Sequence, residues 1–261
     1  MDLVESTLHG YETSTRHPWE LARVRVAASL LRRLAGLPAD GVVVDVGCGD
    51  TFVVEQLAAR FPALRFWAID PAFTPSLVAR FAERLEGQRI TLGRSLDEVS
   101  ADRPVAAVLL MDVIEHVADD VALLRETRQQ SWVDAQTRWL VTVPAVPALF
   151  SAHDRFLGHF RRYDRRMLHV SLTNAGLLPI ELGEFFAGLL PLRWLQLWRE
   201  RRQRVAVGAA TGLAGWRGGA GLSRLLAGGL WLDAAVGLWC ARVGIPWRGL
   251  SVYAVCRRSA S

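Results

Sequence analysis

Two glycines and an acidic residue follow apolar runs at a spacing that suits nucleotide binding. The β-branched run 42–46 leads into Gly47-Cys48-Gly49, and the apolar run 65–69 ends at Asp70. Glycines let the backbone approach a ligand closely because no Cβ intervenes. An acidic residue about 20 positions further on can accept hydrogen bonds from both hydroxyls of an adenosine ribose. We therefore predict a nucleotide site here; the alternative is that Asp70 only caps the following helix.

A second group of reactive side chains lies in the polar stretch 144–169. The stretch contains His153, Asp154, His159, Arg161, Arg162 and Tyr163. Histidine can remove a proton near neutral pH, and arginine binds carboxylates or phosphates. We predict that His153, His159 and Tyr163 face an acceptor substrate and that one histidine is the general base, oriented by Asp154 or Tyr163. The alternative is a solvated surface loop. No metal site is predicted, because the two histidines stand six apart on an expected loop.

The elements that position these residues alternate along the chain. We expect strands at 42–46, 65–69, 89–92, 105–110, 138–143, 179–186 and 250–256, and helices near 17–37, 51–60, 74–85, 119–130 and 164–175. Such alternation predicts an α/β, doubly wound sheet, which binds ligands beyond the carboxyl ends of its strands. That edge would also hold Ser95, Leu96, Met111 and Asp112. Glu115 and His116 would follow there, either shaping the site or capping a helix.

Three motifs occur in order: VVVDVGCGD at 42–50, Asp70, and LLMDVIEHVAD at 109–119. Together they resemble a class I S-adenosylmethionine-dependent methyltransferase, in the small-molecule and lipid branch similar to methyltransferase types 11 and 23. The resemblance covers residues 17–186 and about the last ten, and it includes the HD…GHxRRY pattern within 153–163. It departs at Thr51, where many members carry a third glycine. The glycine fingerprint of nicotinamide-dinucleotide binding would need a glycine at position 52, where this chain has Phe52. A nicotinamide-dinucleotide site is therefore weakened more than a methyltransferase site.

The resemblance implies a Rossmann-like sheet of seven strands with an antiparallel last strand, and S-adenosylmethionine as the cofactor. Residues after the third strand would flank the adenine, and those after the fourth would approach the methionine part. The implied cofactor-binding residues are Asp45, Gly47, Gly49, Asp70, Ser95, Leu96, Met111 and Asp112. Relatives also often carry His-Pro-Trp-Glu before the first strand, so His17 and Trp19 could touch a ligand or simply pack the first helix.

Composition sets the broad class. The 261 residues can bury a sizeable core, and 51% of them are apolar, which excludes a disordered chain. The formal net charge is +5, carried by arginine without any lysine. The three cysteines have no metal-binding spacing, and the polar N-terminus has no secretory signal. We therefore expect a cytoplasmic protein.

Residues 187–248 separate the last two expected strands, which such folds usually join by a short hairpin. This insertion holds nine arginines against two acidic residues, and six of the ten tryptophans. We expect it to form a separate helical subdomain beside the core of 41–186 and 249–261, with 1–40 as an N-terminal arm and helix. Its uncharged runs are shorter than a bilayer span requires. Apolar faces rimmed by tryptophan and arginine suit contact with a membrane, a lid over the sheet, or a dimer surface.

The function expected from these features is methyl transfer to a small-molecule acceptor, hydrophobic or lipid-like. Two other classes compete. A nucleic-acid methyltransferase would suit the basic charge, but the run Met111–Ile114 lacks the Asn/Asp-Pro-Pro-Tyr/Phe pattern of base methylases; no nucleic-acid partner is expected. A non-catalytic, membrane-associated module would have a degenerate site, whereas Asp45, Gly47, Gly49 and Asp70 are intact.

Overall fold

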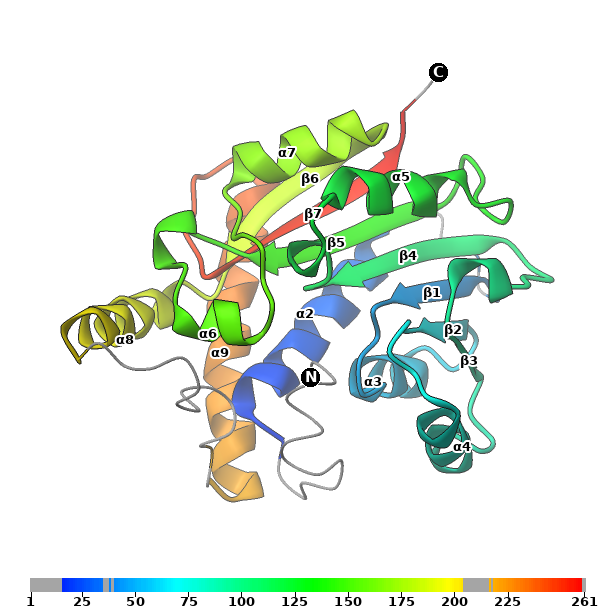
Figure 1. The fold of residues 1–261 in the computed structure, drawn as a ribbon, viewed down its shortest axis with the longest axis horizontal. Helices are drawn as coiled ribbons and strands as arrows, with labels where there is room; N and C mark the ends of the chain where they lie inside the picture. The colour runs from blue at the N-terminus through cyan, green and yellow to red at the C-terminus, as the bar shows by residue number, and fades with distance from the viewer. Residues whose placement is uncertain (1–15, 35–37, 39, 204–215, 217, 260–261) are drawn as a thin grey trace.

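One mixed sheet organises the chain. The computed structural model describes residues 16–34, 38, 40–203, 216 and 218–259, and within them seven strands form a sheet in the order β3-β2-β1-β4-β5-β7-β6 (Figure 1). The strands are β1 Val42–Val46, β2 Arg65–Ile69, β3 Ile90–Gly93, β4 Val105–Met111, β5 Arg138–Pro144, β6 Leu177–Phe185 and β7 Ser251–Arg258. β7 runs antiparallel to both β5 and β6. The predicted fold class is confirmed.

Helices cover both faces of the sheet (Figure 1). They are α2 Pro18–Arg33, α3 Phe52–Arg60, α4 Pro75–Arg84, α5 Asp120–Gln129, α6 Ala152–Phe156, α7 Arg165–Asn174, α8 Leu190–Gln203 and α9 Ala220–Arg242. Short 3₁₀ turns are η1 Leu96–Glu98, η2 Ile114–His116, η3 Pro147–Leu149 and η4 Ala187–Leu189. α5 and α7 lie on one face, while α2, α3 and α9 pack on the other.

The two faces of β1 and β4 build two separate cores, because side chains alternate along a strand. Leu109 belongs to the core under α2 and α3, while its neighbour Leu110 belongs to the core under α5 and α7. All seven residues of β4 are buried, as expected of a central parallel strand. Burying each leucine stabilises the fold by about 1.5–3 kcal/mol. These cores fix where the carboxyl ends of the strands lie.

The segment around His153 differs from the expected loop. Residues 152–156 form the short helix α6, and the Asp154 carboxylate accepts a 2.9 Å hydrogen bond from the Ser151 amide. This Ser-x-x-Asp arrangement is a capping box, a local signal that apolar periodicity does not contain. α6 places His153 and Asp154 on a defined turn of helix.

The insertion is joined to the core rather than separate. β6 and β7 pair from Leu177 opposite Arg258 to Phe185 opposite Ser251, as predicted, and α8 and α9 lie between them in the chain. α9 packs along α2 and β6, and its residues Ala234 and Leu238 are fully buried there. A Cβ on Gly237 would stand 2.4 Å from the Glu184 carbonyl oxygen, so glycine permits this close approach. The expectation of a separate subdomain is therefore wrong for α9.

Candidate active site

The turn between β1 and α3 is held tightly by glycines in left-handed conformations. Gly47 and Gly49 have φ values of 71° and 61°. The amides of Gly47 and Cys48 donate to the Ile69 carbonyl at 2.7 and 3.1 Å, which fixes the turn against the end of β2. A Cβ on Gly47 would stand 2.7 Å from the Val113 side chain. The predicted glycines are thus required by backbone conformation at Gly47 and Gly49 and by close packing at Gly47.

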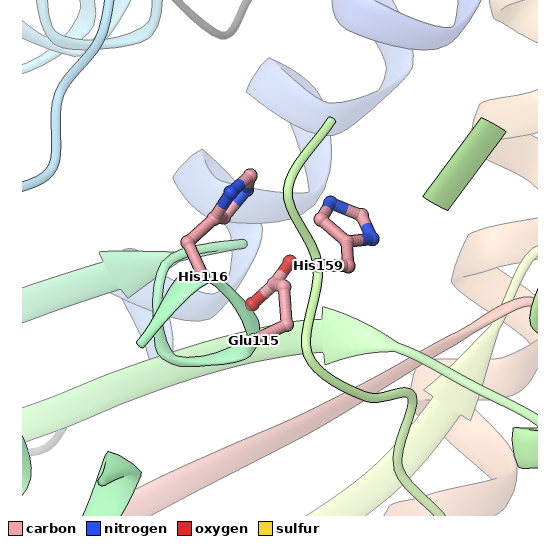
Figure 2. Close-up of side chains that lie close together, drawn as sticks. All are labelled: Glu115, His116 and His159. Carbon is pink, nitrogen blue, oxygen red and sulfur yellow. The ribbon is translucent and has the colours of Figure 1, made fainter. Parts of the chain in front are cut away.

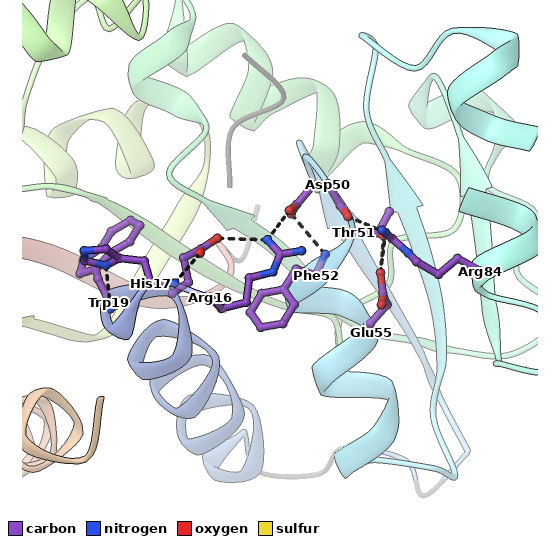
Figure 3. Close-up of polar contacts among 9 residues, drawn as sticks. Arg16, His17, Trp19, Asp50, Thr51, Phe52, Glu55 and Arg84 are labelled. Carbon is purple, nitrogen blue, oxygen red and sulfur yellow. Dashed lines mark hydrogen bonds and ion pairs between the residues drawn. The ribbon is translucent and has the colours of Figure 1, made fainter. Parts of the chain in front are cut away.

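Thr51 stands where the resembled methyltransferases often carry a third glycine, and its conformation explains how a threonine can replace it. Its φ is 63°, the left-handed region that glycine enters without strain and that costs a β-branched residue of order 1–3 kcal/mol. Polar contacts compensate (Figure 3): the Thr51 hydroxyl donates to Glu55 at 2.6 Å and accepts from Arg84 at 2.5 Å. The backbone shape that usually selects glycine is therefore preserved with a threonine.

Asp70 faces the glycine turn. One oxygen of its carboxylate accepts from the Gly49 amide at 2.9 Å, and the other accepts from the Ala72 amide at 2.9 Å. The second contact is a local turn contact like the alternative we considered, but it uses only one oxygen. A carboxylate accepts about four hydrogen bonds, so these two contacts are compatible with ribose hydroxyls as further donors. Sequence reasoning therefore placed Asp70 correctly at the turn.

The N-terminal helix α2 is anchored to the same turn (Figure 3). The Arg16 guanidinium bonds the Asp50 carboxylate at 2.5 Å and stacks 4.2 Å above the centroid of the Phe52 ring. Burial alone would raise the pKa of Asp50, but Arg16 helps to hold it below its ordinary value. His17 accepts a hydrogen bond from the Trp19 amide at 3.1 Å and so caps α2. This capping role explains the position of His17 without any contact to a ligand.

Asp112 occupies the carboxyl end of β4 in a strained conformation. Its φ is 58°, and its carboxylate pairs with Arg23 at 2.8 Å and accepts from the Thr142 hydroxyl at 3.2 Å. Arg23 also donates to the Met111 carbonyl at 3.1 Å. Arg23 comes from α2 and was missed by sequence reasoning. The sequence offered little signal, because Arg23 and Arg25 both stand among the apolar residues of α2 and only Arg23 is buried.

The remaining predicted cofactor residues lie at neighbouring strand ends. Leu96 begins η1 directly after β3 and is buried, and the Ser95 hydroxyl donates to Glu98 at 3.4 Å. Asp45 is buried in β1, and desolvation raises the pKa of its carboxyl to about 7, partly offset by Arg23. We call Gly47–Thr51 with Asp45, Asp70 and Asp112 the glycine-turn region. It unites residues from the ends of β1, β2 and β4.

A buried ionic cluster surrounds Asp154, which has 0% exposure. We define the Asp154 cluster as Ser151, Asp154, His159, Arg162 and Arg193. Asp154 accepts from Ser151 Oγ at 2.8 Å, Arg162 Nε at 2.8 Å and Arg193 at 3.5 Å. Burial would raise the pKa of Asp154, but its hydrogen bonds to His159, Arg162 and Ser151 hold it well below its ordinary value. Arg193 comes from α8, so the insertion meets the polar stretch directly.

The predicted catalytic residues separate into different environments. Tyr163 is 1% exposed, and its hydroxyl donates to the Asp120 carboxylate at 2.8 Å within the core under α5. The prediction that Tyr163 faces an acceptor is therefore corrected, because the buried phenol needs Asp120 as its hydrogen-bond partner. Burial and the nearby Arg193 charge lower the pKa of His153 to about 4. His153 is therefore a weak base at neutral pH.

His159 lies beside two residues that follow β4. Its Nδ1 is 3.1 Å from the Asp154 carboxylate, and its ring stands edge-on to His116 with centroids 4.5 Å apart. Figure 2 shows Glu115, His116 and His159 converging from η2 and from the segment before α7. One potential ligand atom from each lies within 4.8 Å of the others. Asp119, not Glu115, caps α5 by accepting from the Ala122 amide at 2.8 Å, so the capping alternative for Glu115 is wrong.

Glu115 is the least satisfied of these groups. It is 0% exposed, and neither oxygen of its carboxyl group has a hydrogen-bond partner among the residues that the structure describes. Burial, reinforced by the nearby Asp112 charge, raises the pKa of Glu115 well above its ordinary value. A buried polar group without a partner costs roughly 1–3 kcal/mol. Such a cost at the end of a central strand points to a role in the site.

Comparison with known proteins identifies the fold. No family model and no curated protein matches the sequence. Among solved structures, one assigned as a sarcosine dimethylglycine methyltransferase from Galdieria sulphuraria aligns with a TM-score of 0.57 and 14% identity, over 92% of this chain and 86% of its own. A geranyl diphosphate methyltransferase in complex with S-adenosylmethionine has a TM-score of 0.54 and 15% identity, over 90% and 85% of the two chains.

A third solved structure is a Burkholderia thailandensis 1,6-didemethyltoxoflavin-N1-methyltransferase with bound 1,6-didemethyltoxoflavin and S-adenosylhomocysteine. It gives a TM-score of 0.51 and 15% identity, over 91% of this chain and 78% of its own. At these identities the likeness concerns the fold. The chain therefore has the Rossmann-like fold that these methyltransferases share, including the antiparallel seventh strand.

Proposed function

We propose that this chain is a class I S-adenosylmethionine-dependent methyltransferase that acts on a small-molecule acceptor. The shared fold supports this proposal, and so does the glycine-turn region at the carboxyl ends of β1, β2 and β4. In doubly wound sheets, ligands bind at that edge. The cofactor would lie along Gly47 and Gly49, with its ribose at Asp70, its adenine beside Ser95 and Leu96, and its methionine part toward Met111 and Asp112.

The contact between Asp70 and the Gly49 amide carries the proposal. It brings the carboxylate at the end of β2 to within 2.9 Å of the turn after β1, so one ligand could contact both. If Asp70 only capped the following helix, a contact between the ends of β1 and β2 would not be needed. The missing glycine at Phe52 disfavours a nicotinamide dinucleotide in the same place.

Calorimetric titration tests this assignment. We expect the wild-type chain to bind S-adenosylmethionine and S-adenosylhomocysteine but not NADH. Asp70→Asn should weaken binding by about 1.5–3 kcal/mol, the range for charge-assisted hydrogen bonds. The matched control is Asp102→Asn, because Asp102 is 65% exposed and forms a surface ion pair with Arg65. Equal affinity of the Asp70 and Asp102 variants would remove Asp70 from the site.

The reaction needs an acceptor held in line with the methyl–sulfur bond, and most of the rate gain can come from proximity and orientation. The Asp154 cluster lies beyond β5, next to the proposed methionine position at Asp112. We assign the removal of the acceptor's proton to the site around His159, because the Asp154 carboxylate orients the His159 ring. His159→Ala should reduce kcat about 10²–10⁴-fold. His153→Ala should have a smaller effect, since a pKa of about 4 makes its ring a weak base.

We further propose a hydrophobic or lipid-like acceptor, delivered at a membrane surface. On α8, Leu192, Trp194 and Trp198 are 54%, 46% and 50% exposed, and the helix projects away from the sheet beside the Asp154 cluster (Figure 1). Tryptophan and leucine next to Arg199, Arg201 and Arg202 suit an anionic membrane interface. The exposure of Trp194 and Trp198 disfavours a lid formed by α8, whereas Trp231 of α9 is partly buried against the core.

Within the described residues, one helix, α9, is long and apolar enough to cross a membrane, with 28% of its most apolar window buried. Because α9 packs along α2 and β6, we interpret it as part of the fold with an exposed outer face.

Flotation with anionic vesicles at low salt tests membrane contact. We expect the wild type to float and Trp194→Ser/Trp198→Ser to remain in solution. The control is Ile180→Ser, which removes a side chain of similar exposure, 53%, from the edge strand β6. A wild type that stays with the soluble fraction contradicts membrane contact. Sedimentation as a dimer would then assign the exposed face of α8 to a second copy.

A further inference from the structure

The triad of Glu115, His116 and His159 has a composition that metal ions favour. Two imidazoles and one carboxylate form a ligand set used by Zn²⁺ in hydrolases and by non-haem Fe²⁺. The three potential ligand atoms lie within 4.8 Å of one another, and Figure 2 shows the three side chains close together. Tetrahedral ligation with bonds of about 2.0–2.2 Å would need ligand atoms roughly 3.3–3.5 Å apart. Side-chain rotations that move these atoms by about one ångström would bring them to that spacing.

Glu115 provides an independent observation. Its carboxyl group is fully buried and aimed into the triad, and neither oxygen has a hydrogen-bond partner among the described residues. A protonated carboxyl would still need an acceptor for its proton, and an ionised one would need donors or a cation. None of the described side chains supplies them. A bound cation satisfies this group directly.

The surroundings already resemble the outer shell of a metal centre. Nδ1 of His159 lies 3.1 Å from the Asp154 carboxylate; a hydrogen bond donated by Nδ1 leaves the lone pair of Nε2 for a metal. A carboxylate behind a ligating histidine is the usual second-shell arrangement. The nearby guanidinium groups are already paired: Arg23 with Asp112 at 2.8 Å, and Arg162 with Asp154 at 2.8 Å. They therefore repel a cation less than free arginines would.

We propose that Glu115, His116 and His159 bind one divalent transition-metal cation, with Zn²⁺ or Fe²⁺ as the ions best suited to this donor set. Three protein ligands leave a coordination position open. Glu115 and His116 follow Asp112 closely in the chain after the end of β4, where the methionine part of the cofactor is expected.

The role of the ion rests on the proposed methyl transfer, whereas its binding does not. An acceptor hydroxyl or carboxylate that coordinates the open position would be held as the anion, because the cation lowers the pKa of a coordinated hydroxyl. The proton leaves to solvent, the acceptor oxygen forms a bond to the methyl carbon, and the carbon–sulfur bond breaks with its electron pair on sulfur. In this arrangement the ion, rather than the His159 ring, would ionise the acceptor. The substrate class is then a hydroxyl- or carboxylate-bearing small molecule.

Metal content of the full-length chain is the direct test. The protein is dialysed against a chelator, titrated with Zn²⁺, and separately loaded with Co²⁺ as a spectroscopic probe. We expect one equivalent of metal per chain and visible Co²⁺ absorption of a low-coordinate site. Glu115→Gln, His116→Ala and His159→Ala should each weaken Zn²⁺ binding by more than about 100-fold, beyond the 10–100-fold typical of second-shell changes. The control is His169→Ala, an exposed histidine on α7.

The outcomes separate this inference from the proposed function. Glu115→Gln keeps the side-chain volume and replaces the carboxyl group with a neutral amide, so it should fold even if the histidine variants do not. A wild type that binds S-adenosylmethionine but no stoichiometric metal overturns the metal site and leaves the methyltransferase assignment standing. Equal Zn²⁺ affinity in wild type and Glu115→Gln also overturns it. Metal bound without any affinity for S-adenosylmethionine would support the site and refute the methyltransferase assignment.

Discussion

The glycine-turn region and the Asp154 cluster lie at neighbouring strand ends but are built in different ways. The first depends on backbone shape: Gly47, Gly49 and Thr51 all have positive φ, and main-chain amides hold the turn to β2. The second depends on side-chain charge: one buried carboxylate on α6 gathers His159 and Arg162 from the segment before α7 and Arg193 from α8. Backbone shape suits a constant cofactor, whereas a side-chain network can be rebuilt for each acceptor.

The largest effect should come from breaking the ionic network. Asp154→Ala would remove the carboxylate that the buried Arg162 and Arg193 share, and removing one partner of a buried pair typically costs 3–5 kcal/mol. We expect a loss of about this size in the free energy of unfolding by urea. The control is Asp102→Ala, whose exposed pair with Arg65 should be worth less than about 1 kcal/mol. Similar losses for both variants would show that the network is not a stability centre.

A second effect should separate shape from charge in the glycine turn. Gly47→Ala places a Cβ 2.7 Å from Val113 and in a left-handed conformation, so we expect a loss of about 2 kcal/mol in stability and weaker cofactor binding. Adding Val113→Ala should restore only the steric part. If the double variant is as unstable as Gly47→Ala alone, backbone conformation dominates; if Gly47→Ala is neutral, the account of the turn is wrong.

A smaller effect should appear as a pH dependence of stability near His153. The ordinary histidine pKa is 6.5 and that of His153 is about 4, so between these values the unfolded chain binds a proton that the folded chain does not. Stability from this residue is full above pH 6.5 and lost as the pH falls toward 4. His153→Ala should flatten urea midpoints in that window, while His169→Ala should not. The ionisation of Asp154 changes stability only at lower pH, because its pKa lies below the ordinary value of 3.8.

The smallest effect is expected at Thr51. Thr51→Gly relieves the left-handed strain but loses the hydroxyl contacts to Glu55 and Arg84, so the terms oppose each other. We expect the free energy of unfolding to change by less than about 1 kcal/mol and the affinity for S-adenosylmethionine to stay within threefold, about 0.7 kcal/mol. A tenfold loss of affinity would show that the hydroxyl itself serves the cofactor.

The difference between the regions also explains what could be predicted from sequence. Strand ends and glycines are local signals, so the α/β class, the turn and the position of Asp70 could be inferred from alternation and spacing, whereas the antiparallel last strand was implied by the resemblance. Arg23, Arg193 and the triad could not, because their partners lie 39 or more residues away and are set by packing: Arg193 meets Asp154, and Arg23 meets Asp112. The Tyr163 prediction failed for the same reason, since nothing local indicates that Asp120 accepts a hydrogen bond from the Tyr163 hydroxyl.

A structure of the chain with S-adenosylhomocysteine tests the central claim most directly. The account predicts the ribose hydroxyls within about 2.5–3.0 Å of the Asp70 carboxylate, and the adenosine against Gly47 and Gly49. The homocysteine sulfur should lie toward Asp112, facing the triad of Glu115, His116 and His159. A nucleoside bound away from the carboxyl ends of β1 and β2, or no binding at millimolar S-adenosylhomocysteine (about −4.1 kcal/mol), would contradict it.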